Sequence, residues 1–190
     1  MAKATRRLIV GGLLCAAAGA PDASHADDQP DPVRDARPQP GDLLVLADPD
    51  HEAAPIKPDD LKPGDEPTLA WALDPRTKAP RDGSRLNQVL LMRFDPKTLG
   101  DAEQQRAVNG VVAYSAICTH QGCTVTDWLT AKQALQCPCH QSQYDPRQGA
   151  RVVVGPAPRA LPALPLKIVG NALVVAAPFT DRVGGEKTTG

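Results

Sequence analysis

The sequence is poor in aromatic residues, in net charge and in long apolar runs. Trp, Tyr and Phe occur twice each, and the net charge of the 190 residues is −1. Because a nucleic-acid-binding domain is normally basic, this balance argues against that class of function. Proline and glycine are frequent, with 20 and 15 residues, so long uninterrupted helices are not expected. The length fits one domain of ordinary size with appendages.

Cysteine is absent from almost the whole chain. Apart from Cys15, the cysteines lie in two short stretches, CTHQGC at residues 118–123 and CPCH at residues 137–140. Each stretch also contains a histidine, which makes six candidate metal ligands: Cys118, His120, Cys123, Cys137, Cys139 and His140. Thiolates and imidazoles suit zinc, copper and iron–sulfur clusters.

Two kinds of metal site are compatible with these six residues. A structural zinc ion takes four ligands and leaves two thiols without a role. In an oxidising compartment, such thiols tend to form a disulfide. The alternative is a 2Fe-2S cluster held by two thiolates and two imidazoles. In this second alternative the two remaining cysteines bond to each other and tie the two stretches together, so every one of the six residues has a role.

The first 26 residues have the pattern of an export signal. Basic residues precede an apolar run from Leu8 to Ala20, and small residues lead to a cleavage site before Asp27. The motif TRRLIV resembles a twin-arginine signal of bacteria. Because the run is shorter than the ~20 residues of a membrane span, a retained anchor is the second reading. We expect the body in the periplasm or at the periplasmic face of the inner membrane.

The remaining chain divides into three parts by composition. Residues 27–41 are rich in Pro, Asp and Arg and predict an extended linker. Residues 42–180 predict a single domain, with a cluster-binding part at about 115–160, and residues 181–190 predict a flexible tail. The polar stretch 47–66 is expected to be a solvated surface loop.

Short apolar runs broken by Pro, Gly and Asp predict a mainly β, antiparallel domain. The sequence Gly170-Asn171 predicts a tight hairpin turn. One helix is expected over residues 96–108, with its proline early, where proline is tolerated. The expected strands are residues 43–46, 68–73, 87–94, 111–117, 134–137, 151–155, 164–169 and 172–177.

Both cysteine stretches resemble one known family. CTHQGC and CPCHQSQYD match the C-T-H-x-G-C and C-P-C-H-x-S-x-Y-D boxes of the high-potential Rieske iron–sulfur proteins. The resemblance covers residues 105–178 well and residues 42–104 loosely. It implies an antiparallel β sandwich or barrel into which a smaller cluster-binding subdomain is inserted.

The resemblance also implies roles for individual residues. Cys118 and Cys137 should bind one iron of a 2Fe-2S cluster, and His120 and His140 the other. Cys123 and Cys139 should form a disulfide between the two loops.

Two further residues and one loop follow from the resemblance. Ser142 should donate a hydrogen bond to a bridging sulfide, and Tyr144 one to the sulfur of Cys118. Both bonds should raise the reduction potential. The sequence GPAP at residues 155–158 matches the proline loop that covers the cluster in this family.

The function implied is one-electron transfer, as a redox subunit of an oxidoreductase complex. The first hypothesis is the iron–sulfur subunit of a quinol-oxidising cytochrome bc-type complex, with quinol and cytochrome b/c-type subunits as partners. In that role, exposed His120 and His140 would dock quinol and couple electron uptake to proton uptake. The alternative is an electron-relay small subunit of a periplasmic oxidoreductase such as arsenite oxidase, which passes electrons to a c-type cytochrome. The lead-in VVAYS at residues 111–115 resembles that second family.

Overall fold

The structure is a computed structural model and describes residues 31–48 and 53–185. The expected export signal, Cys15 and His51 lie outside these ranges, so the signal stays a prediction. Within these two ranges, no helix combines the length and the apolar character that a membrane crossing requires.

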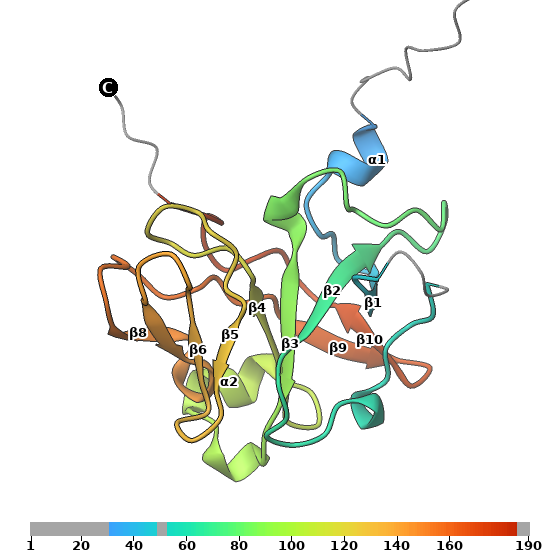
Figure 1. Cartoon of the computed structure of the whole chain (residues 1–190). Coiled ribbons are helices and arrows are strands. Elements are labelled where there is room, and N and C mark those ends of the chain that lie inside the picture. The colour runs from blue at the N-terminus through green and yellow to red at the C-terminus, as the bar shows by residue number, and fades with distance from the viewer. Residues whose placement is uncertain (1–30, 49–52, 186–190) are drawn as a thin grey trace, which may run out of the picture.

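Six antiparallel strands form the larger sheet, in the order β4-β3-β2-β1-β10-β9 (Figure 1). Gly170 and Asn171 both have positive φ angles in the turn between β9 and β10, which confirms the expected hairpin. The bounds are β1 Leu43–Leu46, β2 Thr68–Leu73, β3 Val89–Arg93, β4 Val111–Ser115, β9 Leu166–Val169 and β10 Ala172–Val175.

Four shorter antiparallel strands form a second sheet, in the order β5-β6-β7-β8. They lie together on one side of the larger sheet in Figure 1. The bounds are β5 Asp127–Leu129, β6 Ala134–Gln136, β7 Gln143–Asp145 and β8 Arg151–Val154. The whole unit is inserted between β4 and β9, as the sequence predicts for a cluster-binding subdomain.

The larger sheet closes on itself behind the insertion. Tyr114 in β4 forms an antiparallel bridge with Ala163, in the segment that leads to β9. Backbone hydrogen bonds from Ser115 to Pro162 and from Leu164 to Ala113 extend this closure. The expected mainly β fold of sandwich or barrel type is therefore confirmed.

Strands β3 and β4 are buried on both faces because each face packs against a different apolar core. Leu90 and Met92 of β3 belong to a core that also contains Cys118 and Tyr144 from the insertion. Val89 and Leu91 alternate with them and face a second core inside the larger sheet. The insertion is thus built directly on the back of β3 and β4.

The prediction of a single helix over residues 96–108 is wrong. A 3₁₀ turn, η3 Pro96–Thr98, is followed by a separate helix, α2 Asp101–Arg106. Leu99 and Gly100 between them are extended, with ψ angles of 142° and 160°. Leu99 is buried, so its packing keeps the chain out of a continuous helix.

Two short strands and one buried segment differ from what the sequence predicts. Strands β5 and β7 were not expected, because each has three residues and no apolar run. In the polar stretch 47–66, Ile56 and Leu61 are buried in the second core, on either side of η1 Pro58–Asp60. That part of the stretch is therefore not a solvated loop.

The described part of the expected linker is docked on the domain. Helix α1 Pro32–Asp35 is short, and Asp31 caps it. The carbonyl of Val33 accepts a hydrogen bond from Arg81, and the carbonyl of Ala36 accepts one from Asn87, the last residue of η2 Arg85–Asn87.

A buried ion pair anchors the same region. The Arg81 guanidinium donates to both carboxylate oxygens of Asp42, at 2.5 and 3.0 Å, and both side chains are at most 6% exposed. The hydrogen bond that Arg81 donates to Asp42 raises the pKa of Arg81 above its ordinary value, although burial opposes this. Arg81 is therefore charged, and its charge is compensated mainly by Asp42 and further by the buried carboxylate of Asp74 at 3.6 Å.

Asp42→Ala should lower the free energy of unfolding by about 3–5 kcal/mol, because it leaves a buried guanidinium without its main partner. Asp82→Ala is the matched control. It removes the partner of the half-exposed Arg34 and should cost less than about 1 kcal/mol. Urea unfolding followed by circular dichroism measures the free energy of unfolding of both variants. Equal losses would contradict the assignment of Arg81 and Asp42 as the ion pair that anchors this region.

Candidate metal centre

Two loops carry the six candidate ligands, and they share one backbone pattern. In loop 1 (residues 118–123) the N–H of Cys118 donates to the carbonyl of Cys123, and the N–H of Gly122 donates back to Cys118. Loop 2 (residues 137–142) repeats both bonds, between Cys137 and Ser142 and between Gln141 and Cys137.

The left-handed position falls at the same place in each loop. Gly122 and Gln141 have φ angles of 76° and 55°. The two loops therefore present their first cysteine and their histidine from matching turns, as a site shared between them requires.

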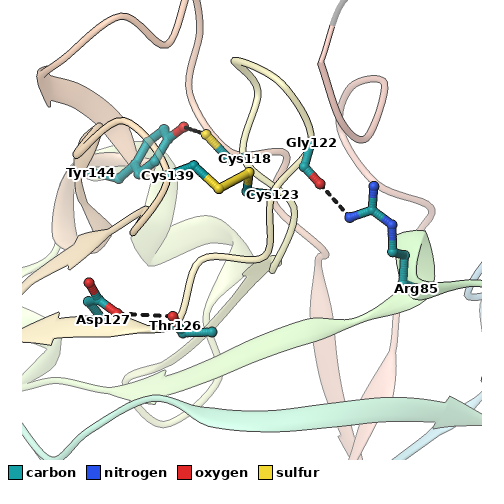
Figure 2. Close-up of a disulfide and its surroundings, with 8 residues drawn as sticks. All are labelled: Arg85, Cys118, Gly122, Cys123, Thr126, Asp127, Cys139 and Tyr144. Carbon is teal, nitrogen blue, oxygen red and sulfur yellow. Dashed lines mark hydrogen bonds between the residues drawn. A yellow bond between two sulfur atoms is a disulfide. The ribbon is translucent and has the colours of Figure 1, made fainter.

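The four cysteines separate into a disulfide and two free thiols. Cys123 and Cys139 are joined by a disulfide that links loop 1 to loop 2 (Figure 2). Cys118 and Cys137 are free and 1% exposed. The sulfurs of Cys137 and of the disulfide lie within 4.8 Å of one another. Because disulfide sulfurs are not thiolates, only Cys118 and Cys137 can act as sulfur ligands.

Burial disfavours charge on the Cys137 thiol in the absence of a cation. Burial is the largest cause that raises the pKa of the Cys137 thiol, and the neighbouring Cys118 raises it further. Backbone N–H groups of Cys139 and His140 oppose this rise. A metal ion is what would hold both sulfurs as thiolates here.

The two histidines meet at the outer side of the loops. The rings of His120 and His140 are in edge-to-face contact, with centroids 4.6 Å apart. The Nδ1 atom of His120 is buried and has no hydrogen-bond partner among the described residues. An unpartnered buried nitrogen is unfavourable unless a ligand satisfies it, so this atom fits a metal.

The residues present therefore fit a 2Fe-2S cluster. They offer two free thiols and two imidazoles from facing loops, the donor set that a cluster of mixed ligation uses. The remaining two cysteines, Cys123 and Cys139, form a disulfide and are not available as ligands, as the resemblance to the Rieske proteins implies.

A third segment, the proline loop (residues 155–159), completes the site. The N–H of Ala157 donates to Oγ of Ser142, which is fully buried. The hydroxyl of Thr119 donates to the carbonyl of Arg159 at 2.6 Å. The disulfide therefore joins loop 1 to loop 2, Ser142 joins loop 2 to the proline loop, and Thr119 joins loop 1 to the proline loop.

The hydroxyl of Tyr144 points toward the sulfur of Cys118, as Figure 2 shows. Its hydroxyl lies 3.1 Å from Cys118 Sγ. Burial, and then the contact with Cys118, raise the pKa of Tyr144, so its hydroxyl stays protonated. The structure therefore brings Ser142 and Tyr144 to the two loops, where the sequence predicts them.

Some contacts of loop 1 were not foreseen from the sequence. Arg85 of η2 hydrogen-bonds the carbonyl of Gly122 across the loop from the disulfide (Figure 2). Thr119 also had no assigned role, although it lies inside the CTHQGC motif. A signal existed only for Thr119, because Arg85 contacts a loop that is distant in the sequence.

The chain is similar to proteins of one family. Residues 92–165 match the family model described as the Rieske [2Fe-2S] domain. A cytochrome bc1 complex Rieske iron-sulfur subunit from Streptomyces lividans is 35% identical over 137 residues, which cover 68% of this chain and 78% of the relative.

Other relatives are matched over less of their length. The Streptomyces coelicolor protein of the same name is also 35% identical, but the match covers only 38% of it. A protein provisionally named as a respiratory nitrate reductase subunit Rieske from Haloferax mediterranei is 40% identical over 98 residues, 51% of this chain and 44% of that protein. A chain from a solved hyperthermophilic respiratory Complex III is 25% identical, with a TM-score of 0.43 over 68% of this chain and 83% of that chain.

Gly155→Ala should lower the free energy of unfolding by at least about 2 kcal/mol, because its Cβ would lie 2.6 Å from Cα of Ser142. Gly155 has a φ of 94°, and Gly41, with a φ of 100° and no atom within 4 Å of an added Cβ, is the matched control. Gly41→Ala carries the backbone strain without the clash. Thermal unfolding measures the stability of both variants. Losses of the same size would show that a methyl group at position 155 does not clash with Ser142 of loop 2.

Proposed function

This chain belongs to the Rieske [2Fe-2S] family, and we propose that it is the iron–sulfur subunit of a quinol-oxidising cytochrome bc-type complex. The single observation that carries the electron-transfer role is the pair of loops that sets two free, buried thiols beside two imidazoles under a disulfide. The similarity to the Streptomyces bc1 subunit supports the choice of complex.

Four residues hold the cofactor in this proposal. Cys118 and Cys137 supply thiolates from the buried side, and His120 and His140 supply imidazoles from the outer side. The bound cluster accepts and returns one electron, at a potential of roughly −150 to +300 mV for mixed Cys/His ligation, against about −400 mV for all-cysteine plant-type clusters.

Exposure of the site is strongly one-sided. Both thiols are 1% exposed, whereas His140 and the neighbouring Pro138 and Gln141 are exposed. Electrons therefore enter and leave on the histidine side, where the ring of His140 can meet a quinol hydroxyl. The sulfur side faces the apolar core, which excludes water from the thiolates.

Two hydroxyl groups favour electron uptake. A thiolate bound to iron has no proton, so the Tyr144 hydroxyl is the donor in the bond to Cys118. The Oγ of Ser142 accepts from Ala157, which leaves its own proton free to donate within the site. Both donors stabilise the more negative, reduced state.

The relay-subunit alternative rests on the motif VVAYS, which the structure places in β4. All five residues of this strand are buried, so core packing explains the motif without a partner. The provisional name of the Haloferax relative does favour a second class, in which a Rieske subunit serves a respiratory reductase. The periplasmic location that we propose is common to both.

The protein isolated from its native membranes should contain iron and acid-labile sulfide in equal amounts and give a Rieske-type electron paramagnetic resonance (EPR) signal when reduced. Cys118→Ala should abolish both. The control Cys123→Ala/Cys139→Ala removes the disulfide and should cost about 3 kcal/mol of stability while leaving the ligand set intact. A wild-type protein that contains zinc and gives no signal would contradict the cofactor assignment.

The same preparation distinguishes the partners. Affinity purification in mild detergent should recover haem b and haem c with the tagged chain, and the cluster should become reduced when quinol is added to this complex. Recovery of a large reductase subunit without haem b would instead support the relay role.

Tyr144→Phe should lower the midpoint potential by about 30–60 mV, which is a threefold to tenfold change in the one-electron equilibrium. The variant removes the donor to Cys118 with almost no change in volume. Tyr114→Phe is the matched control, since its hydroxyl donates to the carbonyl of Pro146, outside the two ligand loops. It should cost about 1–2 kcal/mol of stability and leave the potential in place. Redox titration of both variants measures the difference, and equal shifts would contradict the role of Tyr144.

A further inference from the structure

The chain beyond β10 returns to the metal centre and crosses loop 1. Thr180 fixes the start of this passage, since its N–H donates to Ala163 and its hydroxyl accepts from the same residue. Residues 181–185, which the sequence assigns to a flexible tail, then run to His120. We call residues 181–185 the C-terminal strap.

The end of the strap lies directly on the main chain of His120. A Cβ added to Gly185 would be 2.5 Å from the carbonyl oxygen of His120 and 3.2 Å from Cα of Gln121. These neighbours are backbone atoms and cannot rotate away. Glycine is therefore required at position 185 by the close approach of two main chains.

Arg159 ties the strap to both loops that flank it. Its Nη2 donates to the carbonyl of Gly184 at 2.6 Å, and its Nη1 lies 3.5 Å from the carboxylate of Asp181. Its own carbonyl accepts the hydroxyl of Thr119 in loop 1. One residue of the proline loop thus holds the strap and loop 1 together.

The position of His120 depends on its main chain. Its buried Nδ1 has no hydrogen-bond partner among the described residues, and its ring contacts the ring of His140, the other proposed ligand. No group within residues 31–48 and 53–185 therefore holds this nitrogen in place. Loop 1 is held on either side of it by Thr119 on Arg159 and Arg85 on Gly122, and at His120 itself by the packing of the strap.

We propose that the C-terminal strap, anchored by Arg159, positions His120 at the metal centre. Its residues and Arg85 lie outside residues 92–165, which match the family model. In this proposal Gly185 and Arg159 are positioning residues. The consequence for the metal centre rests on the proposed function, whereas the consequence for loop 1 does not.

Gly185→Ala should release loop 1, because the added methyl group cannot fit against His120. Amides of residues 119–123 should exchange with deuterium about tenfold faster, while those of β3 and β4 keep their rates. In the protein as isolated, the EPR line positions should shift. The one-electron equilibrium constant should change at least about threefold, which is ~28 mV.

Gly83→Ala is the matched control. An added Cβ at Gly83 would lie 2.2 Å from the carboxylate of Asp35, which can rotate away, and 3.0 Å from the backbone of Arg34, so the same substitution crowds the other terminal segment, although less tightly than at Gly185. It should lower stability without any change in the exchange of residues 119–123, in the EPR signal or in the potential.

Arg159→Lys and Arg159→Gln separate the tether from the charge. The first keeps a cation but loses the reach to Gly184, and the second loses both. If the strap positions the loop, both variants should speed exchange at residues 119–123. A potential shift in Arg159→Gln alone, with exchange unchanged in both, would show a purely electrostatic role and overturn the proposal.

Two further results would overturn it. One is Gly185→Ala with wild-type exchange in loop 1. The other is faster exchange of equal size in Gly83→Ala, which would reflect only general loss of stability. Failure of the proposed function gives a different result. If the wild-type protein has no Rieske signal, the variants of Gly185 and Arg159 still show through deuterium exchange whether the strap holds loop 1.

Discussion

The metal centre depends on three links that hold three irregular segments together. Loop 1 is joined to loop 2 by a disulfide, loop 2 to the proline loop by Ser142, and the proline loop to loop 1 by Thr119. None of these segments belongs to a strand, so no ladder of hydrogen bonds keeps them in register. A triangle of links prevents any one segment from moving without straining two others. Preorganisation of this kind keeps ligands at fixed separations when an electron arrives.

The one-sided exposure of the site follows from where the insertion is built. Strands β3 and β4 pack against apolar cores on both faces, and the core behind the insertion includes Cys118, Cys137 and Tyr144. The sulfur side is therefore continuous with the interior, and the histidine side is what remains for solvent or a partner. Tyr114 strengthens this attachment, because its buried hydroxyl bonds Pro146 beyond β7. The same packing that stabilises the domain thus sets the direction in which an electron can leave.

The sequence predicts the larger sheet and the candidate ligands for different physical reasons. Strands such as β1 and β2 are apolar runs between turn residues, and burial of such runs is a local signal. The candidate ligands stand out because cysteine is otherwise almost absent. Strands β5 and β7 were not predicted because short, mostly half-buried segments of three residues have no such signal. The predicted helix over residues 96–108 is longer than α2, because the extended conformation of Leu99 depends on its burial. The contacts of Arg81 and Gly185 could not be predicted, since they join segments far apart in the sequence.

Both described ends of the chain pack onto the domain, and this limits how the domain can move relative to its attachments. Residues 31–41 are held by Arg81 and Asn87, and Arg81 is itself anchored by a buried ion pair. A swing of the domain about this segment would have to break the hydrogen bonds of Arg81 to Val33 and of Asn87 to Ala36, at a cost of about 1–3 kcal/mol for each buried group that loses its partner. The segment therefore behaves as part of the rigid body. Residues 31–41 are therefore not the hinge that the proposed role between quinol and cytochrome would need, and they determine the face of the domain from which the preceding chain departs.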